Sequence, residues 1–340
     1  MSSTIFTISD NKEVVLKVKG LHTSLFNSTG KAWLKVVRNL NFTVKKNQLL
    51  AIVGESGCGK SVTALSILRL LDPDASQISG EVFINGKDVL SLNNTELEKI
   101  RGRRVAMIFQ DPMTSLNPIK RIGDLIIEAI SLHSTISKSD ARKEAIRLLD
   151  EVQIPSPKRC LMAYPHELSG GMRQRVMIAI ALSMKPDLII ADEPTTSLDV
   201  TVQAQVIKLF KERVKSHGTA TILITHDIAL VSGFADEILV MYAGRIVEYG
   251  PIERVLMKPA HPYTAGLLAS LCTLESQPGD RLTSIPGNPP QPDNIPNGCA
   301  FHPRCDMAIK KCATEMPPMI TGPFHDQGAA ECHKAWNIKD

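Results

Sequence analysis

Residues 49–68 read Leu-Leu-Ala-Ile-Val-Gly-Glu-Ser-Gly-Cys-Gly-Lys-Ser-Val-Thr-Ala-Leu-Ser-Ile-Leu. An apolar run at 49–53 predicts a buried strand, and residues 62–68 are typical of a helix. Between them, residues 54–61 match the phosphate-loop pattern G-x-x-x-x-G-K-[ST]. Glycines let backbone N–H groups surround phosphates, and the N-terminus of the following helix adds partial positive charge. The segment therefore predicts a strand, a loop and a helix that together bind a nucleotide.

Each part of this loop has an expected role. Lys60 should reach the β- and γ-phosphates, and Ser61 should ligate Mg²⁺. The remaining residues expected to contact the nucleotide are Gly54, Glu55, Ser56, Gly57, Cys58, Gly59 and Val62. A glycine-rich turn without a ligand is the alternative, and the full match between a strand and a helix disfavours it.

Further patterns predict an α/β fold with a parallel sheet. Residues 188–191 and 220–225 are continuous apolar runs like 49–53, as expected of strands covered on both faces. Residues 138–152 and 170–184 indicate helices between them, so strands and helices alternate. Residues 14–19 and 39–45 instead alternate apolar and polar side chains, which predicts antiparallel strands.

Two carboxylates, Asp192 and Glu193, follow the apolar run at 188–191. Paired charges at the end of a buried strand are unfavourable unless a cation or a reaction uses them. We expect Asp192 to bind Mg²⁺, directly or through water, and Glu193 to polarise the attacking water. The pair alone is weak evidence, because many strands end in acidic residues, but with the phosphate loop it becomes specific.

A second anion site is predicted at residues 168–175, Leu-Ser-Gly-Gly-Met-Arg-Gln-Arg. Ser169 is a good N-cap, and Gly170 and Gly171 leave the first helical turn bare. One chain has no evident need for two γ-phosphate sites. The sequence resembles the ATP-binding-cassette ATPases, in which this signature segment closes over ATP held by the phosphate loop of a partner subunit.

The resemblance runs in order over residues 14–250 and implies further roles. Gln110 matches the glutamine that senses Mg²⁺ and the attacking water, and His226 matches the switch histidine that contacts the γ-phosphate. Asp199, in residues 197–199, matches the loop that crosses the dimer interface. The family places an aromatic residue before the phosphate loop to stack on adenine; Phe26 is the candidate here, although Leu25 could occupy its position. Met172 replaces the usual glutamine of the signature.

A finer resemblance, to the dipeptide/oligopeptide importer ATPases, is carried by residues 110–118 and 164–175 and by His-Pro-Tyr-Thr at 261–264. It implies a cassette domain over residues 1–255, with a parallel core sheet, an antiparallel β subdomain and a helical subdomain at about 111–185. An extension over residues 256–340 follows. The implied partners are a second ATPase subunit in a heterodimer, two transmembrane permeases and an extracytoplasmic substrate-binding protein. The implied location is the cytoplasmic face of the inner membrane.

Other functions remain open at this point. A soluble cassette ATPase acting on DNA or ribosomes is one; the DNA-repair type has a long coiled coil between its ATP motifs, and the 131 residues between Lys60 and Asp192 contain no heptad tract. The net charge of +4 gives no case for nucleic acid. Import of a non-peptide solute, such as a nickel chelate or glutathione, is another. No apolar stretch approaches the ~20 residues that span a bilayer, and the N-terminus lacks a secretion signal.

The last part of the chain contains four of the seven cysteines, namely Cys299, Cys305, Cys312 and Cys332. Four thiolates can bind Zn²⁺ or a [4Fe–4S] cluster, and either would stabilise a proline-rich segment too small for its own core. The spacing lacks the paired C-x₂-C of zinc ribbons. The family's extension can carry [4Fe–4S], so the resemblance favours the cluster, with zinc, a disulfide or unliganded thiols as alternatives. Cys58, Cys160 and Cys272 are expected to have no metal role.

Overall fold

The computed structural model describes residues 13–111, 115–195, 200–270, 284–323 and 328–336. Its centre is a parallel sheet in which β3 (Leu49–Val53), β8 (Ala220–Thr225) and β7 (Leu188–Asp192) are neighbours. β6 (Val105–Ile108) pairs with β7 on one side, and β9 (Glu237–Tyr242) pairs with β3 on the other. Every residue of β3, β7 and β8 is buried. The three apolar runs are thus central parallel strands, as predicted.

A second sheet is antiparallel and has the order β2-β1-β4-β5. Its long strands are β1 (Val14–Asn27), β2 (Ala32–Lys45) and β4 (Ser76–Ile84), and β5 (Lys87–Asp88) closes its edge. One apolar cluster joins this sheet to the core sheet and to α1 (Lys60–Ile67), the helix after the phosphate loop. The antiparallel strands expected at 14–19 and 39–45 are confirmed, and both are longer than the alternating segments.

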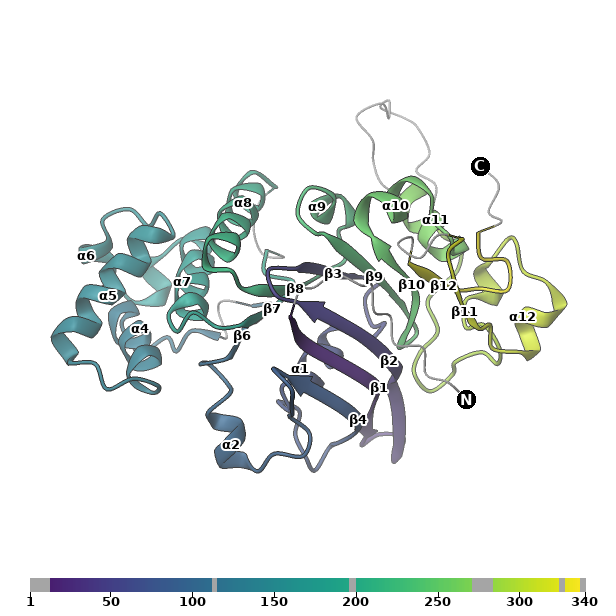
Figure 1. Cartoon of the computed structure of the whole chain (residues 1–340), viewed down its shortest axis with the longest axis horizontal. Coiled ribbons are helices and arrows are strands. Elements are labelled where there is room, and N and C mark those ends of the chain that lie inside the picture. Colours follow the sequence, from purple (N-terminus) through teal and green to yellow (C-terminus); the bar gives the residue numbers. More distant parts are fainter. Residues whose placement is uncertain (1–12, 112–114, 196–199, 271–283, 324–327, 337–340) are drawn as a thin grey trace.

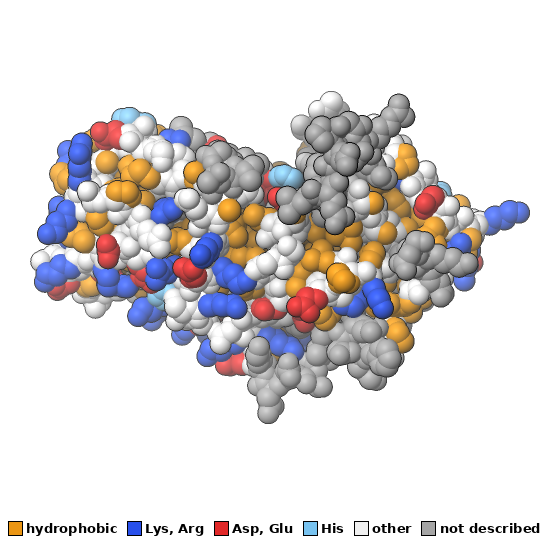
Figure 2. Space-filling view, turned by 90° about the horizontal axis from the view of Figure 1, so that it is seen from above, with side chains coloured by type: hydrophobic (Ala, Val, Ile, Leu, Met, Phe, Trp, Pro, Cys, Tyr) orange, Lys and Arg blue, Asp and Glu red, His pale blue; other side chains and the backbone are white. Residues whose placement is uncertain are grey.

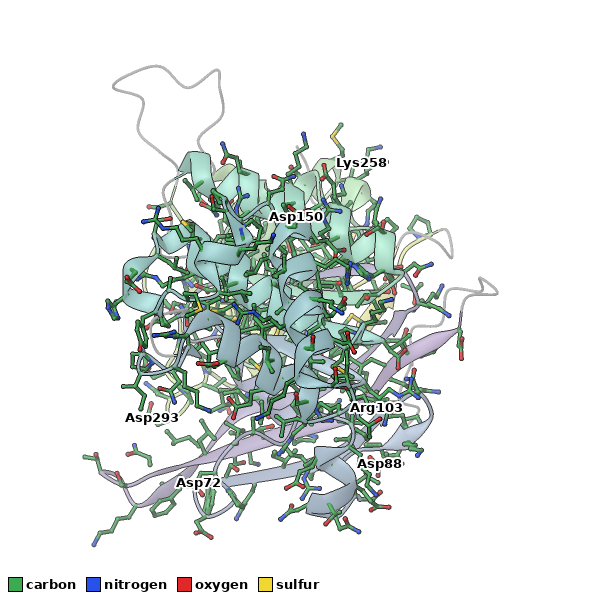
Figure 3. The ribbon with its side chains drawn as sticks, turned by 90° about the vertical axis from the view of Figure 1, so that its left-hand side faces the viewer. Asp72, Asp88, Arg103, Asp150, Lys258 and Asp293 are labelled. Atoms are coloured by element: carbon green, nitrogen blue, oxygen red, sulfur yellow. The ribbon has the colours of Figure 1, made fainter. Side chains whose placement is uncertain are left out.

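The helical part of the cassette lies at one end of the molecule (Figure 1). It consists of α4 (Ile122–Ser131), α5 (Lys138–Glu151), α6 (Pro157–Cys160), a short 3-10 helix η1 (Pro165–Glu167) and α7 (Gly170–Leu182). Seen from that end, α5 with Asp150 lies on the side opposite Asp72 and Asp88 of the antiparallel part (Figure 3). From above, Lys and Arg side chains are interspersed with acidic ones over these helices (Figure 2). The helices predicted at 138–152 and 170–184 are confirmed.

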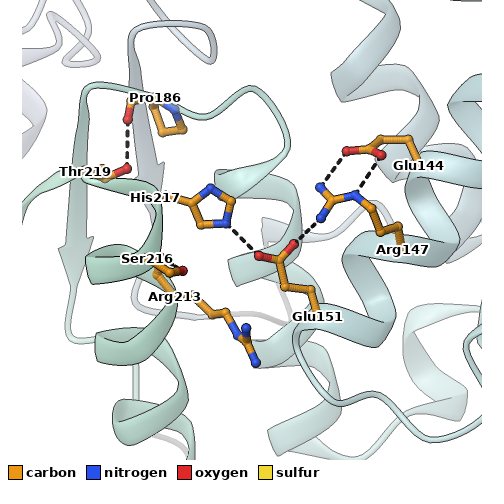
Figure 4. A network of polar contacts seen from close by, with 8 residues as sticks. All are labelled: Glu144, Arg147, Glu151, Pro186, Arg213, Ser216, His217 and Thr219. Carbon is orange, nitrogen blue, oxygen red and sulfur yellow. Dashed lines mark hydrogen bonds and ion pairs between the residues drawn. The ribbon is translucent and has the colours of Figure 1, made fainter.

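A polar network ties the helical part to the core (Figure 4). His217, the last residue of α8 (Val200–His217), lies 2.6 Å through Nε2 from Oε1 of Glu151 in α5. Arg147 donates to Oε2 of the same carboxylate at 2.8 Å and to Glu144. Burial acts to raise the pKa of Glu151, but the hydrogen bond from His217 and the charge of Arg147 outweigh it and lower this pKa. Glu151 thus stays ionised and links two elements that are distant in sequence.

The extension continues the core sheet. β10 (Arg245–Pro251) pairs with β9 on one side and with β12 (Ala329–Glu331) on the other, and β11 (Met319–Thr321) forms the edge. In the sequence, four described helices lie between β10 and β11: α10 (Ile252–Met257), α11 (Pro262–Ala269), the 3-10 helix η2 (His302–Arg304) and α12 (Lys310–Thr314). The proline-rich residues 285–298 contain no helix or strand.

Two shorter helices complete the described fold. α2 (Asn94–Glu98) begins with a capping box at Asn93, and α9 (Ile228–Ser232) follows β8. Among the described residues, no helix is long and apolar enough to cross a membrane.

Candidate active site

The phosphate loop turns sharply between β3 and α1, and its glycines permit the turn. Gly59 has φ of 103°, in the left-handed region, and a Cβ there would lie 2.9 Å from the Val36 carbonyl oxygen. At Gly54 a Cβ would lie 2.3 Å from the Met241 carbonyl oxygen, at the end of β9. No larger side chain fits at either position without moving backbone. The loop is therefore packed directly against the ends of neighbouring strands.

The two residues predicted to hold phosphate and Mg²⁺ lie at the first turn of α1. Lys60 is buried, and its Nζ donates to the carbonyl oxygens of Gly54 at 2.7 Å and Glu55 at 3.1 Å. Ser61 Oγ donates to Asp192 Oδ1 at 3.1 Å. The structure therefore brings together the hydroxyl and the carboxylate that the sequence assigns to Mg²⁺.

The Asp192 carboxylate is suited to a cation. Burial raises the pKa of Asp192, the hydrogen bond from Ser61 opposes this, the nearby Glu193 carboxylate adds to it, and Lys60 opposes it. A buried carboxylate beside a second one is stabilised in its charged form by a divalent cation. Hard oxygen ligands of this kind are the ones Mg²⁺ prefers. The donor set at Ser61 and Asp192 thus fits Mg²⁺.

Two of the three predicted catalytic residues, Gln110 and His226, both contact the third, Glu193. Its Oε2 accepts a hydrogen bond from Gln110 Nε2 at 3.1 Å and lies 3.2 Å from His226 Nδ1. Glu193 follows β7 with φ of 43°, a left-handed conformation that is uncommon for this residue type. Such backbone geometry clusters at functional sites because the surrounding fold must hold it. Three segments, after β6, β7 and β8, therefore converge on one carboxylate.

These residues share one open pocket of about 540 Å³. Its lining residues are Val36, Ser56, Gly57, Gly59, Lys60, Ser61, Val62, Gln110, Glu193 and His226. Val36 was not predicted, because it lies in β2 and belongs to no motif. Glu55 does not line the pocket, and its carboxylate instead contacts Arg304. Cys58 is buried, and burial raises the pKa of its thiol, so its backbone rather than its side chain serves the loop.

The predicted adenine-stacking residue, Phe26, lies near the turn that connects β1 to β2. Phe26 is 42% exposed and pairs across the strands with Trp33, whose ring centroid is 5.3 Å away. Neither ring lines the pocket. Stacking on adenine by Phe26 or Leu25 stays a prediction.

The signature segment does not line this pocket. Ser169 caps α7, with its Oγ accepting from the Met172 N–H at 3.3 Å, and Gly170 and Gly171 open the helix. The first two residues of this helix therefore have no side chain beyond hydrogen, and anion binding there, completed by another subunit, stays a prediction. Asp199, predicted to cross the dimer interface, lies outside the described residues.

The His-Pro-Tyr-Thr motif at 261–264 forms the start of α11. His261 is the N-cap, with Nδ1 accepting the Tyr263 N–H at 3.0 Å, and burial lowers the pKa of His261 to about 3, which keeps the ring neutral. Tyr263 is fully buried and its hydroxyl accepts the Glu55 N–H at 2.9 Å. This motif, one of those that carry the finer resemblance, thus contacts the phosphate loop.

The four tail cysteines are free thiols in separate segments. In the part of the chain that the structure describes, no three His, Cys, Asp or Glu side chains are arranged to hold a metal ion. The thiols do influence one another: burial raises the pKa of Cys299 to about 11, and Cys312, Cys332 and Cys305 contribute to the rise. The Cys299 N–H donates to the Cys312 carbonyl oxygen at 2.8 Å, so these two residues lie side by side.

The strand–loop–helix, the paired carboxylates and the separate signature helix together define an ATP-binding-cassette ATPase. The family model described as ABC transporter matches residues 37–196, and the model described as oligopeptide/dipeptide transporter, C-terminal region, matches residues 247–312. The chain belongs to the ABC transporter family.

Individual relatives are similar over nearly the whole length. The chain is 45% identical to the oligopeptide transport ATP-binding protein OppD of Escherichia coli (strain K12), covering 93% of both chains. It is 48% identical to OppD of Bacillus subtilis (strain 168), covering 90% of this chain and 85% of that protein.

Solved structures support the same fold. The dimeric post-hydrolysis cassette MJ0796 bound to ADP and Pi matches with a TM-score of 0.62 and 28% identity, covering 70% of this chain and 98% of that one. The cbiO1 structure from Clostridium perfringens matches with a TM-score of 0.61 and 26% identity, covering 73% and 92%.

Proposed function

We propose that this chain is the ATP-hydrolysing subunit of an importer of di- and oligopeptides. One observation supports the ATPase part of the proposal: Gln110 and His226 both contact the Glu193 carboxylate beside the phosphate loop. The peptide part is supported by the relatives, which are named as oligopeptide transport or peptide import ATP-binding proteins. The match of the extension to a region named for oligopeptide and dipeptide transporters supports it too.

In the proposed reaction, the side chains hold the phosphates, the metal ion and the attacking water in position. Lys60 would leave its two carbonyl partners to bind the β- and γ-phosphates. Ser61 and Asp192 would hold Mg²⁺, whose charge would offset that of the phosphates. Glu193 orients and polarises the attacking water, while Gln110 and His226 fix the direction of its carboxylate. Little covalent chemistry by the protein is required, because phosphoryl transfer depends mainly on positioning and electrostatics.

The signature segment takes part from a second subunit in this proposal. Ser169, Gly170 and Gly171 lie outside the pocket that holds Lys60, so they are available to ATP bound on a partner, for which we propose a related ATPase in a heterodimer. ATP that binds well only to the closed pair shifts the population toward closure, and hydrolysis reopens it.

Contact with the two permeases is proposed at the segment that follows Gln110. The Ile119 side chain of this segment is 82% exposed. Phe109, which precedes Gln110, and Met162 are exposed as well. Arg121, two residues after Ile119, has its Nη1 3.8 Å from Met162 Sδ. Large apolar side chains that stay exposed are candidates for a protein interface. Such contacts would hold the chain at the cytoplasmic face of the inner membrane, and an extracytoplasmic binding protein would deliver the peptide.

Peptide uptake tests this proposal. In cells deleted for the gene, we expect loss of uptake of a labelled tripeptide and restoration by the wild-type chain but not by Glu193→Gln. Normal peptide uptake together with loss of nickel-chelate or glutathione uptake would reassign the solute. Co-purification with ribosomes or DNA in place of permeases would favour the soluble type of cassette ATPase.

For the tail, we propose that Cys299, Cys305, Cys312 and Cys332 hold a [4Fe–4S] cluster. The Cys299 N–H donates to the Cys312 carbonyl oxygen at 2.8 Å, so two of the four already lie side by side, which supports a common site. Four cysteine thiolates are the ligand set that a [4Fe–4S] cluster takes in proteins. It would join α12 to β12 and so stabilise a segment with little core.

Metal analysis of the anaerobically purified chain tests the cluster. We expect about four irons per chain and a visible absorption band, both lost in a Cys305→Ser variant. Cys160→Ser, which alters a buried thiol in α6, is the matched control and should retain the iron. Zinc alone, or no metal, would contradict the cluster.

A further inference from the structure

The extension contacts the phosphate loop through an ion pair that spans most of the sequence. Arg304, in η2, donates from Nη1 to Glu55 Oε2 at 2.7 Å and from Nη2 to Glu55 Oε1 at 2.9 Å. The Arg304 side chain is 7% exposed and that of Glu55 is 24% exposed. A two-pronged pair of this kind is stronger and more directional than a single contact, and its burial shields it from salt. Arg304 therefore fixes the position of the Glu55 side chain.

The backbone of Glu55 is held as well. Its N–H donates to the buried Tyr263 hydroxyl at 2.9 Å, and its carbonyl oxygen accepts from Lys60 Nζ at 3.1 Å. One residue of the phosphate loop is thus held at three points. Two of the three contacts come from Tyr263 and Arg304, which belong to the extension. The third comes from Lys60, the lysine predicted to bind the phosphates.

The group that holds Glu55 is itself rigid. Arg304 Nε donates to the Pro286 carbonyl oxygen at 2.9 Å, and Nη1 donates to the Tyr242 hydroxyl at 3.3 Å. The Phe301 ring lies 5.3 Å from the rings of both Tyr242 and Tyr263. Tyr242 ends β9, so this aromatic cluster connects the core sheet, α11 and the tail. Packed rings of this kind resist displacement.

We infer that Arg304 and Tyr263 are positioning residues of the ATP site, which hold Glu55 and thereby keep the phosphate loop in the conformation that receives ATP. Ser56 and Gly57, the next residues of the loop, line the pocket, whereas Glu55, Tyr263 and Arg304 do not. The two residues act through the loop and do not touch the nucleotide. ATP affinity is thus coupled to docking of the extension, whichever solute is transported.

Titration of Mg-ATP into the purified full chain tests the inference with Arg304→Gln, Glu55→Gln and the double variant. Each single change should weaken ATP binding about five- to tenfold, the lower range of typical coupling between distinct sites. The double variant should bind no more weakly than either single one, because all three break the same contact. Arg304→Lys keeps the charge but loses the two-pronged geometry, so it should give an intermediate affinity.

Arg245→Gln is the matched control. Arg245 pairs with Glu331 of β12, with Nε 2.8 Å from Oε2, so it also joins cassette and extension but does not contact the loop. It should lower thermal stability while leaving ATP affinity within about twofold of wild type. Tyr263→Phe removes one hydroxyl and should weaken ATP binding about two- to threefold, as expected for the loss of one hydrogen bond.

Three results would overturn the inference. One is an unchanged ATP affinity in Arg304→Gln, and another is additive losses in the double variant. The third is a loss of affinity in Arg245→Gln equal to that in Arg304→Gln, which would mean that general loosening of the tail is responsible.

Discussion

Replacement of Glu193 by Gln is expected to leave ATP binding intact and to slow hydrolysis by about 10²- to 10⁴-fold, the usual contribution of a positioned general base. The amide has nearly the same shape as the carboxylate, so the contact with Gln110 Nε2 at 3.1 Å can persist. The variant loses the negative charge that polarises water. Phosphate release and ATP affinity, measured on the same preparation, separate the two effects.

Asp187→Asn is the control for this experiment. Asp187 immediately precedes β7, at the end opposite Glu193, and its carboxylate pairs with Arg104 and accepts from Asn85 Nδ2 at 2.8 Å. The same chemical change there should leave hydrolysis within about twofold of wild type, because exposed ion pairs contribute little. Unchanged turnover in Glu193→Gln would remove Glu193 from the role proposed for it.

Replacement of Lys60 by Met is expected to weaken ATP binding by about 100-fold or more. In the structure Nζ donates to the Gly54 and Glu55 carbonyl oxygens, so the ammonium group is already directed toward the loop. Hydrogen bonds between charged groups contribute about 1.5–3 kcal/mol each, and two such bonds to phosphate oxygens account for a loss of this size. Equilibrium binding of a fluorescent ATP analogue measures it.

The methionine variant also has a structural control. Its thermal unfolding midpoint should stay near that of wild type, because the aliphatic part of the side chain still fills the buried space beside the loop. Lys19→Met, on the antiparallel sheet, removes the same charge from an exposed pair with Glu81 and should leave ATP binding unaltered. ATP binding by Lys60→Met that equals wild type would place the phosphates elsewhere.

Local patterns predicted most of the cassette. The apolar runs at 49–53, 188–191 and 220–225 are long enough and apolar enough to be central strands, and the loop at 54–61 can serve only between a strand and a helix. The sequence assigned Glu193 to the attacking water and, by resemblance, His226 to the γ-phosphate. Parallel strands end at the same edge of a sheet, so residues just after β7 and β8 can meet beside the phosphate loop. Glu193 and His226 do lie there, 3.2 Å apart.

The tail could not be predicted in this way. Its proline-rich composition predicted irregular backbone, and its cysteines drew attention to metal chemistry. Nothing local indicated that β12 would add to the core sheet beside β10, since strands of three residues have no recognisable period. Pairing at a sheet edge depends on which backbone groups the rest of the fold leaves free.

The sequence by itself determined the nucleotide chemistry, because the phosphate loop, Asp192 and Glu193 lie in short segments whose spacing and flanking strands identify them. Only the tertiary structure revealed that Arg304 and Tyr263 hold Glu55, because the two contacts join residues 249 and 208 positions apart. A charged residue in a 3-10 helix of three residues has no periodicity or motif that identifies its partner. Its role depends on packing that brings the extension against the loop, and packing is a property of the whole fold.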